Sequence, residues 1–315
     1  MKINKYEKIL VAGAKGMLGK AVVKILKKKG YKNILSPSKK ELNFLHLIKL
    51  NQYFKKNKPK YIIMCAAKVG GIKDNQINKL QYLEENLKIQ DNFFKIAKKY
   101  KTKKNVFIGS SCIYPKKSPQ PIKETSLLSG KLEETNEGYA LAKIIGIKKA
   151  EYYFNKYGLL TICPILCNIY GTNDNFDPNR SHVLSALVKK FVDAKFNNLD
   201  QVTLWGTGKP EREFMHVNDA AEALTILFER YNFPEIINVG SGTRISIKNL
   251  SKKIAKYSKY EGKLVWDKSM ADGMMKKYLN ISKLKKLKFK TKISIDTGIK
   301  KTIYEYKKNL NKINT

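Results

Sequence analysis

The sequence has few cysteines and histidines and lacks any long apolar run. Its four cysteines, at 65, 112, 163 and 167, form no Cys-x-x-Cys pair, and only three histidines accompany them. This composition indicates neither a disulfide framework nor a metal site, and reduced thiols are typical of a cytoplasmic protein. No apolar run approaches the roughly 20 residues of a membrane span, and the N-terminus shows no signal-peptide region. We therefore expect a cytoplasmic location and no membrane partner.

Arginine is scarce in spite of a large excess of positive charge. The formal net charge is +37, yet the 63 basic residues include arginine only at 180, 212, 230 and 244. Nucleic-acid recognition favours arginine because its guanidinium forms bidentate bonds, and the lysines here are spread along the whole chain. We therefore expect no nucleic-acid partner, although an anionic small molecule would be attracted to such a surface.

The order of the apolar segments predicts an α/β fold. Buried strands are expected at 9–13, 33–35, 61–66, 105–109 and 159–166. Helical patterns lie between them near 17–29, 46–57, 78–100 and 137–157. This alternation is typical of the doubly wound parallel sheet of a Rossmann fold. Shorter strands are expected later, at 202–205, 236–239 and 263–266.

The change of pattern after the fifth strand predicts two lobes. We expect a Rossmann domain over residues 1–171 that binds the dinucleotide and carries the catalytic side chains. A smaller α/β lobe that binds the substrate is expected over residues 172–315. Because no low-complexity linker separates them, the lobes should be interleaved around a cleft.

A glycine-rich loop follows the first expected strand and opens the first helix. Glycines at such a turn let the backbone approach a pyrophosphate at the helix N-terminus. After the second strand, where NAD-specific enzymes carry an acid, this chain has Ser38 and Lys39 and no acid before Glu41. Lysines would attract a 2′-phosphate, so the sequence predicts NADP(H) as the cofactor. The expected contacts from these two turns are Gly13, Lys15, Gly16, Met17, Leu18, Gly19, Ser38 and Lys39.

Tyr139 and Lys143 begin the fourth expected helix at a spacing that puts both side chains on one face. A carbonyl reduction needs a proton donor beside the hydride acceptor, and a nearby ammonium stabilises the phenolate. Ser110 ends the fourth strand, where open α/β sheets bind their ligands, and is placed to hydrogen-bond a substrate carbonyl. Serine, tyrosine and lysine together predict the site of a short-chain dehydrogenase/reductase.

Longer strings resemble one branch of these enzymes. The distinctive ones are residues 66–72, 109–115, 135–143, 174–176, 181–183 and 212–219. From about residue 8 to 308 the chain resembles the GDP-L-fucose synthase family of extended short-chain reductases. Enzymes of that family act on GDP-4-keto-6-deoxymannose: they invert C3 and C5 through enol intermediates, and NADPH then reduces C4.

The resemblance implies further site residues. It assigns Cys112 and His182 to the acid-base pair that exchanges the protons at C3 and C5. It adds Ala66, Ala67, Lys143 and His182 to the cofactor contacts. The substrate contacts that it implies are Lys68, Val69, Gly70, Ser111, Asn168, Lys190, Trp205, Arg212 and Lys277. Helices near 78–100 and 137–157 are expected to form the four-helix contact of a homodimer.

The chain also departs from the family pattern. The proline before Asn168 is shifted back to Pro164, an arginine becomes Lys189-Lys190, the string Gly-Thr-Pro-Arg-Lys becomes residues 273–277, and His46 replaces an acid. Because Ser110, Tyr139 and Lys143 are unaffected, reduction is the firmer expectation. The alternatives are a C4 reductase of a GDP-4-keto-6-deoxyheptose without epimerisation, a nucleotide-sugar 4-epimerase and a non-catalytic dinucleotide sensor or basic nucleic-acid binder.

Overall fold

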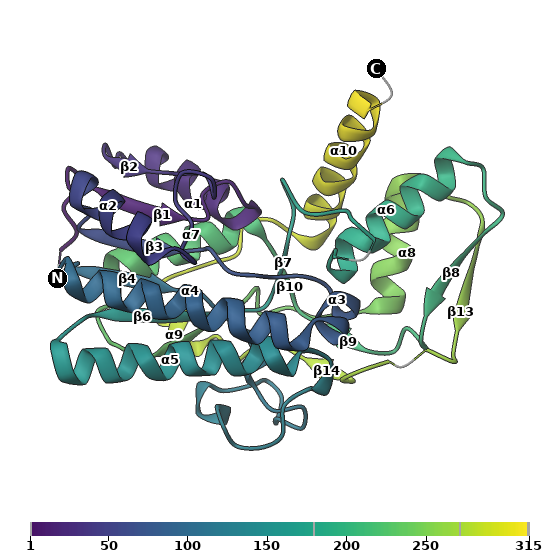
Figure 1. Cartoon of the computed structure of the whole chain (residues 1–315). Coiled ribbons are helices and arrows are strands. Elements are labelled where there is room, and N and C mark those ends of the chain that lie inside the picture. Colours follow the sequence, from purple (N-terminus) through teal and green to yellow (C-terminus); the bar gives the residue numbers. More distant parts are fainter. Residues whose placement is uncertain (1, 179, 271, 314–315) are drawn as a thin grey trace.

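The computed structural model describes residues 2–178, 180–270 and 272–313, and a parallel sheet forms the centre of its larger part (Figure 1). The strands run in the order β11-β6-β4-β3-β1-β2, with β5 pairing β6 beyond the end of β4. Every pair in this sheet is parallel, which confirms the doubly wound α/β fold. The strands are β1 Ile9–Ala12, β2 Ile34–Leu35, β3 Tyr61–Met64, β4 Lys104–Phe107, β5 Gly109–Ser110, β6 Thr161–Leu166 and β11 Ile236–Val239.

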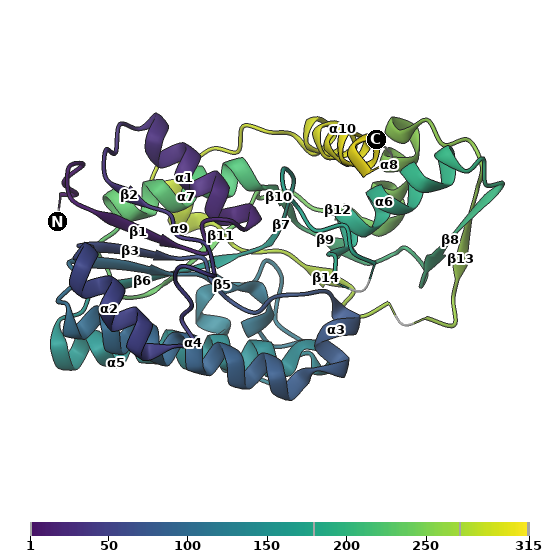
Figure 2. The same ribbon diagram turned by 45° about the horizontal axis from the view of Figure 1, so that its top comes forward.

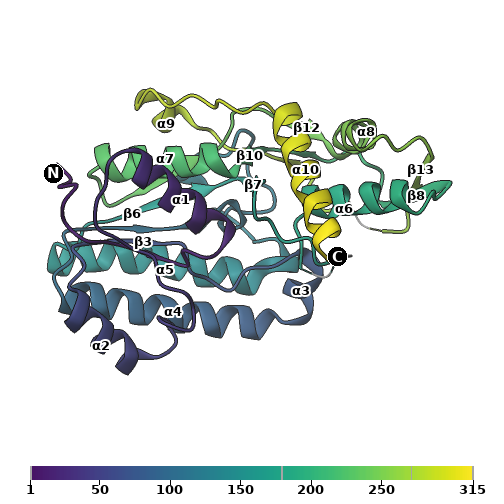
Figure 3. The same cartoon turned by 90° about the horizontal axis from the view of Figure 1, so that it is seen from above.

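Helices cover both faces of this sheet, which gives three layers (Figures 2 and 3). On one face α1 packs on α7, and on the other α4 packs on α5 beside α2. Strands β1, β3, β4 and β6 are buried along their whole length, as expected for β-branched and apolar strands covered twice. The helices are α1 Met17–Lys28, α2 Leu47–Asn57, α4 Lys79–Lys99, α5 Glu137–Tyr157 and α7 Val217–Arg230.

Strand β2 lies on one side of β1 and β3 lies on the other, so the chain crosses over β1 between these two strands. The loops after β1 and β3 therefore meet at one edge of the sheet. A Cβ on Gly13 would lie 2.8 Å from the backbone nitrogen of Ala66, and Gly13 has a φ of +75° that favours glycine. Ligands of open α/β sheets bind at this switch point.

Two late segments complete the first sheet. Strand β11 pairs with β6 from Ile236 to Val239, and α7 covers the face that it shares with α1. One apolar core joins Val11 and Ile165 with Leu224 and Val239. The lobe boundary at residue 171 stays a prediction, but these later segments pack with the first sheet.

The outer part of the molecule has its own apolar core. Phe191, Leu250 and Ile299 belong to it, on three helices that lie beside one another at one end of the molecule (Figures 2 and 3). Its helices are α6 Val183–Phe196, α8 Ile247–Ser258 and α10 Ile295–Ile313. Its strand pair is β8 Gln201–Trp205 with β13 Lys263–Asp267.

Short elements connect the two parts. Two small sheets lie between them: β7 pairs with β10, and β9 lies between β12 and β14. The bounds are α3 Ile72–Ile77, β7 Asn168–Tyr170, β9 Glu211–Arg212, β10 Phe214–His216, β12 Ile245–Ser246, β14 Lys276–Lys277 and α9 Ser282–Lys286. Among the residues that the structure describes, no helix has the length and apolar character needed to cross a membrane.

Candidate active site

Ser110, Tyr139 and Lys143 lie where the sheet meets the start of α5. The Nζ of Lys143 is 5.7 Å from the centre of the Tyr139 ring and donates a 2.8 Å hydrogen bond to the carbonyl of Ile108. Ile108 lies between β4 and β5, outside the paired strands, so its carbonyl can accept this bond. Ser110 directly follows in β5, and its Oγ accepts the backbone N–H of Cys112 at 3.4 Å.

Burial changes the proton affinity of both helix residues. The pKa of the Tyr139 phenol is raised well above its ordinary value, mainly by burial, with Cys112 and Tyr82 adding to the effect. Burial lowers the pKa of Lys143 to about 8, although the neighbouring Cys65 and Cys163 oppose this change. Near neutral pH the phenol therefore keeps its proton while the lysine still carries most of its charge. Such a pair can donate a proton to an oxygen that gains negative charge.

Cys112 lies beside this pair and has two hydrogen-bond donors at its sulfur. The Nδ2 of Asn136 is 3.1 Å from Sγ, and the Nζ of Lys277 is 3.7 Å from it. Asn136 immediately precedes α5, whereas Lys277 comes from β14 at the far end of the sequence. The structure thus brings Cys112 together with one predicted substrate residue.

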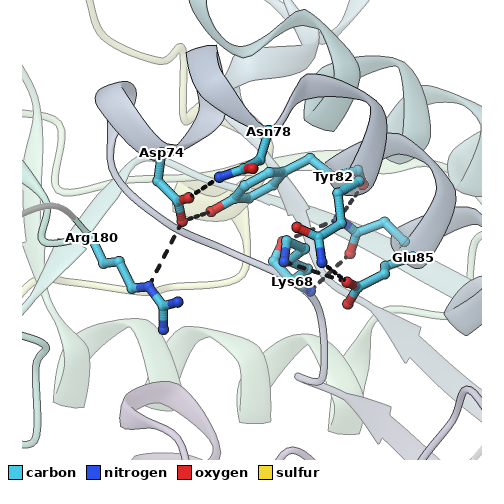
Figure 4. Close-up of polar contacts among 8 residues, drawn as sticks. Lys68, Asp74, Asn78, Tyr82, Glu85 and Arg180 are labelled. Atoms are coloured by element: carbon cyan, nitrogen blue, oxygen red, sulfur yellow. Dashed lines mark hydrogen bonds and ion pairs between the residues drawn. The ribbon is translucent and has the colours of Figure 1, made fainter.

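Lys68 belongs to a polar cluster on α3 and α4 (Figure 4). Its Nζ lies 3.4 Å from Glu85 and 5.3 Å from the centre of the Tyr82 ring. The hydroxyl of Tyr82 donates to Asp74 at 2.7 Å, and the edge of its ring meets Tyr139 with 6.4 Å between the centroids. This cluster therefore packs against the ring of Tyr139.

Asp74 extends the cluster toward the loop that carries His182. Its carboxylate accepts a 2.6 Å bond from Asn78 and lies 4.0 Å from the Nε of Arg180 (Figure 4). The hydrogen bond from Tyr82 is the main cause that lowers the pKa of Asp74, so this carboxylate is ionised. His182 itself is exposed at the N-cap of α6.

The glycine loop fits a dinucleotide. A Cβ on Gly19 would overlap the carbonyl of Gly13, so α1 packs directly on the loop that precedes it. Gly16, the N-cap of α1, makes no side-chain cap, which leaves the first N–H groups of the helix to an anion. Met17 and Leu18 turn their side chains to the apolar core, so a cofactor would meet their backbone. Ala66 and Ala67 are half-buried beyond β3.

The turn after β2 fits a 2′-phosphate. Ser38 and Glu41 hold each other: the Ser38 N–H donates to the Glu41 carboxylate at 2.7 Å, and the Glu41 N–H donates to Ser38 Oγ at 3.3 Å. The carboxylate of Glu41 is thereby bound to the backbone of this turn. Lys15 and Lys39 are exposed, and the charge of Lys15 reaches Glu41. The exposed ammonium groups of Lys15 and Lys39 could therefore bind a phosphate at this turn.

Other predicted substrate residues lie on the small sheets. Arg212 and Lys277 are directly opposite each other in the pairing of β9 with β14. Burial lowers the pKa of Arg212, with Glu133 and Asp272 opposing it. The Nδ2 of Asn168 donates to the carbonyl of Glu213 at 2.9 Å, which joins β7 to β10. Two cations on neighbouring strands suit a diphosphate.

The remaining predicted residues are dispersed. Ser111 is buried, and Val69 is exposed beside Gly70, where a Cβ would overlap the Tyr82 hydroxyl. Lys190 and Trp205 lie on α6 and β8 in the outer part (Figure 1). There the Nζ of Lys190 donates to the carbonyl of Thr203 at 2.7 Å, and Trp205 is 61% exposed. Their role in substrate binding stays a prediction.

Sequence reasoning missed three supporting residues. Asn136 contacts Cys112, and Tyr82 contacts Tyr139. The third is Glu213, a buried carboxylate that accepts the N–H groups of Gly242 at 2.7 Å and Leu279 at 2.9 Å. Glu213 stands in the charged string Glu211-Arg212-Glu213, so the sequence alone gives no signal that its carboxylate is buried. The contacts of Asn136 and Tyr82 arise only when distant helices pack.

The chain is similar to known proteins along almost its whole length. Residues 9–240 match the NAD dependent epimerase/dehydratase family. GDP-L-fucose synthase 1 of Arabidopsis thaliana is 42% identical over 307 residues, which are 98% of this chain and 95% of that protein. The solved GDP-L-fucose synthetase of Naegleria fowleri bound to NADP has a TM-score of 0.91 and 28% identity, covering 99% of this chain and 97% of that one. A GDP-mannoheptose C4 reductase from Campylobacter jejuni with NADP bound has a TM-score of 0.88 and 32% identity, covering 97% of this chain and 99% of that one.

Proposed function

This chain belongs to the GDP-L-fucose synthase group of the NAD dependent epimerase/dehydratase family, and we propose that it reduces C4 of a GDP-4-keto-6-deoxy sugar and inverts C3 and C5. The observation that carries this proposal is the contact of Lys143 with Tyr139 and with the carbonyl of Ile108, two residues before Ser110 at the carboxyl end of the sheet. NADP is bound in solved relatives, and the glycine loop and the lysines near it fit the same cofactor.

When bound at the glycine loop, NADPH would supply the hydride that C4 accepts in the reduction. The Ser110 hydroxyl donates a hydrogen bond to the ketone oxygen and fixes its position. Tyr139 gives its proton to that oxygen as the negative charge develops. Lys143 remains anchored to the carbonyl of Ile108, and its charge stabilises the phenolate that is left.

In the epimerisation, Cys112 and His182 exchange the protons on the carbons next to the ketone. Such a proton is acidic because its loss gives an enolate, and inversion requires removal from one face and return to the other. One residue of the pair takes the proton and the other returns one. Arg212 and Lys277 hold the diphosphate meanwhile, so that the sugar stays in place between the two steps.

Replacing Tyr139 by Phe tests the reduction. Because the variant keeps the ring but lacks the proton donor, we expect kcat for NADPH oxidation with GDP-4-keto-6-deoxymannose to fall by roughly 10²- to 10⁴-fold. Proton exchange at C3 and C5 should persist. It is measured as deuterium uptake in the presence of NADP⁺. A variant that consumes NADPH at the native rate would contradict the proposal.

One alternative has a specific observation in its favour. The chain has Met274 and Met275 in place of the family's threonine and proline, and a GDP-mannoheptose C4 reductase shares its fold at a TM-score of 0.88. An enzyme that only reduces C4 of a heptose would keep Ser110, Tyr139 and Lys143. The product formed with NADPH in deuterated water separates the two: deuterium at C3 and C5 identifies epimerisation, and its absence selects reduction alone.

We also propose that the enzyme is a cytoplasmic homodimer that associates through α4 and α5. All four cysteines are free thiols, as in a reducing compartment. The two helices lie side by side along the molecule (Figure 3), and Leu80, Leu141, Ile145 and Tyr152 are exposed on them. Replacing Ile145 by Glu should lower the mass measured by light scattering from twice 36.1 kDa to 36.1 kDa. A native protein that already has the smaller mass would exclude the dimer.

A further inference from the structure

Asn136 occupies the N-cap of α5 but does not cap it. Asparagine at this position normally accepts an N–H from the first turn of the helix, which stabilises it by about 1 kcal/mol. Here no side-chain cap is formed. The Nδ2 of Asn136 instead points at Cys112 Sγ, 3.1 Å away, and its Oδ1 is buried with no partner among the described residues. The side chain of Asn136 bonds a distant sulfur in place of the helix N–H groups beside it, which indicates a role in the site.

The surroundings of Cys112 favour hydrogen-bond donation to the sulfur. Besides Asn136, the ammonium of Lys277 lies 3.7 Å from Sγ, and Ser110 holds the backbone N–H of Cys112. Donors at a sulfur fix where it lies, and a general base must be held within reach of the proton that it takes. Cys65 and Cys163 also lie near a cation, Lys143, but burial raises the pKa of both, as it raises that of Cys167.

We propose that Asn136 is a positioning residue for the epimerisation, whose amide, together with Lys277, holds the Cys112 sulfur in place to accept a proton. This rests on the proposed role of Cys112. In the step, the thiolate takes a proton from a carbon next to the ketone. The electron pair of the broken C–H bond forms the C=C bond of the enolate, and the π pair of the C=O bond moves onto the oxygen. When the C=O bond re-forms, the carbon takes a proton from His182 on the other face. Nothing is oxidised or reduced.

Substitution of Asn136 by Asp separates this role from helix capping. Aspartate caps helices as well as asparagine does, so it would restore or improve α5 if capping were the function. It has no N–H to donate, however, and its negative charge opposes a thiolate. Asn136→Ala removes both properties, and Lys277→Met removes the second donor without touching α5.

The first readout is the rate at which iodoacetamide alkylates Cys112, followed across pH by mass spectrometry of the peptide that contains it. At pH 7 we expect a decrease of about three- to tenfold in Asn136→Ala, a larger one in Asn136→Asp and a smaller one in Lys277→Met. A native profile in Asn136→Asp would overturn the proposal, since only the cap would then matter.

The second readout is deuterium uptake at C3 and C5 of the keto sugar with NADP⁺ present. Uptake should fall in both Asn136 variants, whereas dinucleotide binding should not change. Cys112→Ser is the reference: if it exchanges at the native rate, the proposed role of Cys112 fails, while the alkylation profiles still report whether Asn136 acts on the sulfur. Native exchange in Asn136→Asp together with lost exchange in Cys112→Ser would overturn the role of Asn136 alone.

Discussion

Burial shifts the pKa values of Tyr139 and Lys143, the proposed catalytic pair, in opposite directions. It raises the pKa of Tyr139 and lowers that of Lys143 to about 8, because the protein interior disfavours both a phenolate and an ammonium. The phenol therefore enters the reaction protonated. The lowered pKa of Lys143 makes the loss of its proton less costly. The Ile108 carbonyl keeps the lysine side chain in place.

His216 offers a test of burial on stability. Burial lowers its pKa to about 4, and its Nδ1 accepts the N–H of Asn218 at the start of α7. Between the ordinary value of 6.5 and this lowered value, the unfolded chain binds a proton that the folded chain does not. The free energy of unfolding should therefore fall by about 1–2 kcal/mol between pH 7 and pH 5 on account of this residue.

The matched variant is His216→Asn, which keeps an acceptor for Asn218 but does not titrate. Urea unfolding at several pH values measures the difference between the two proteins. The native protein should lose stability relative to the variant as the pH drops through 6.5. Parallel curves from pH 7.5 to pH 5 would show that His216 is not buried as described.

At the scale of elements, the start of α1 depends on two glycines that differ in the space around them. A Cβ on Gly19 would overlap the Gly13 carbonyl, whereas one on Gly16 would meet it at 3.4 Å, an ordinary contact. Gly19→Ala should therefore separate α1 from the loop, lower Tm by several degrees and weaken NADPH binding at least tenfold. Gly16→Ala should change Tm by less than about 2 °C, because its φ suits any residue. Thermal denaturation and NADPH fluorescence measure both, and equal Tm values would contradict this.

The contact between α4 and α5 at Tyr82 gives a second test. Tyr82→Phe keeps the ring against Tyr139 and loses only the bond to Asp74, so kcat for reduction should stay within about threefold of native. Tyr82→Leu loses the ring contact as well, and kcat should fall by about tenfold, since a displaced proton donor is inefficient. Steady-state kinetics with NADPH distinguish the two, and equal activities would show that the ring does not position Tyr139.

The strands and helices whose bounds the sequence patterns predicted lie within two residues of their observed ends, but no bounds were predicted for α6, α7, α8 and α10. Runs such as Tyr61–Met64 are apolar enough to be recognised as buried strands without any knowledge of their neighbours. The break at Ile108 was missed, because the apolar run continues through Ile108 and only the pairing with β6 shows where it is interrupted. The position of β11 beside β6 also depends on contacts far apart in the chain, which local patterns do not contain.

The site divides in the same way. Ser110, Tyr139 and Lys143 could be found because a short spacing and a strand end place them. Lys277 was named as a substrate residue only through the resemblance, and its approach to Cys112 comes from the packing of β14 on β9. Tertiary packing also sets the side-chain direction of Asn136, which capping preferences alone would predict wrongly.

At the scale of the whole molecule, the net charge of +37 should affect substrate capture. A positive surface attracts an anionic GDP sugar, and salt screens this attraction over about 8–10 Å at physiological ionic strength. Raising NaCl from roughly 20 to 300 mM should increase KM for the sugar several-fold and leave kcat within about twofold. Initial rates at each salt concentration measure this, and a constant KM would mean that the lysines do not act on the substrate.

The pairing of β6 with β11 has a consequence for synthesis of the protein. The ribosome must make about three quarters of the 315 residues before Ile236–Val239 emerges and can join its neighbour. Until then the nascent chain exposes the edge of β6 and the side of α1 that α7 later covers, which are surfaces prone to aggregation. The cofactor-binding half can therefore be complete only after the ribosome has translated β11, although most of this half is encoded earlier in the chain.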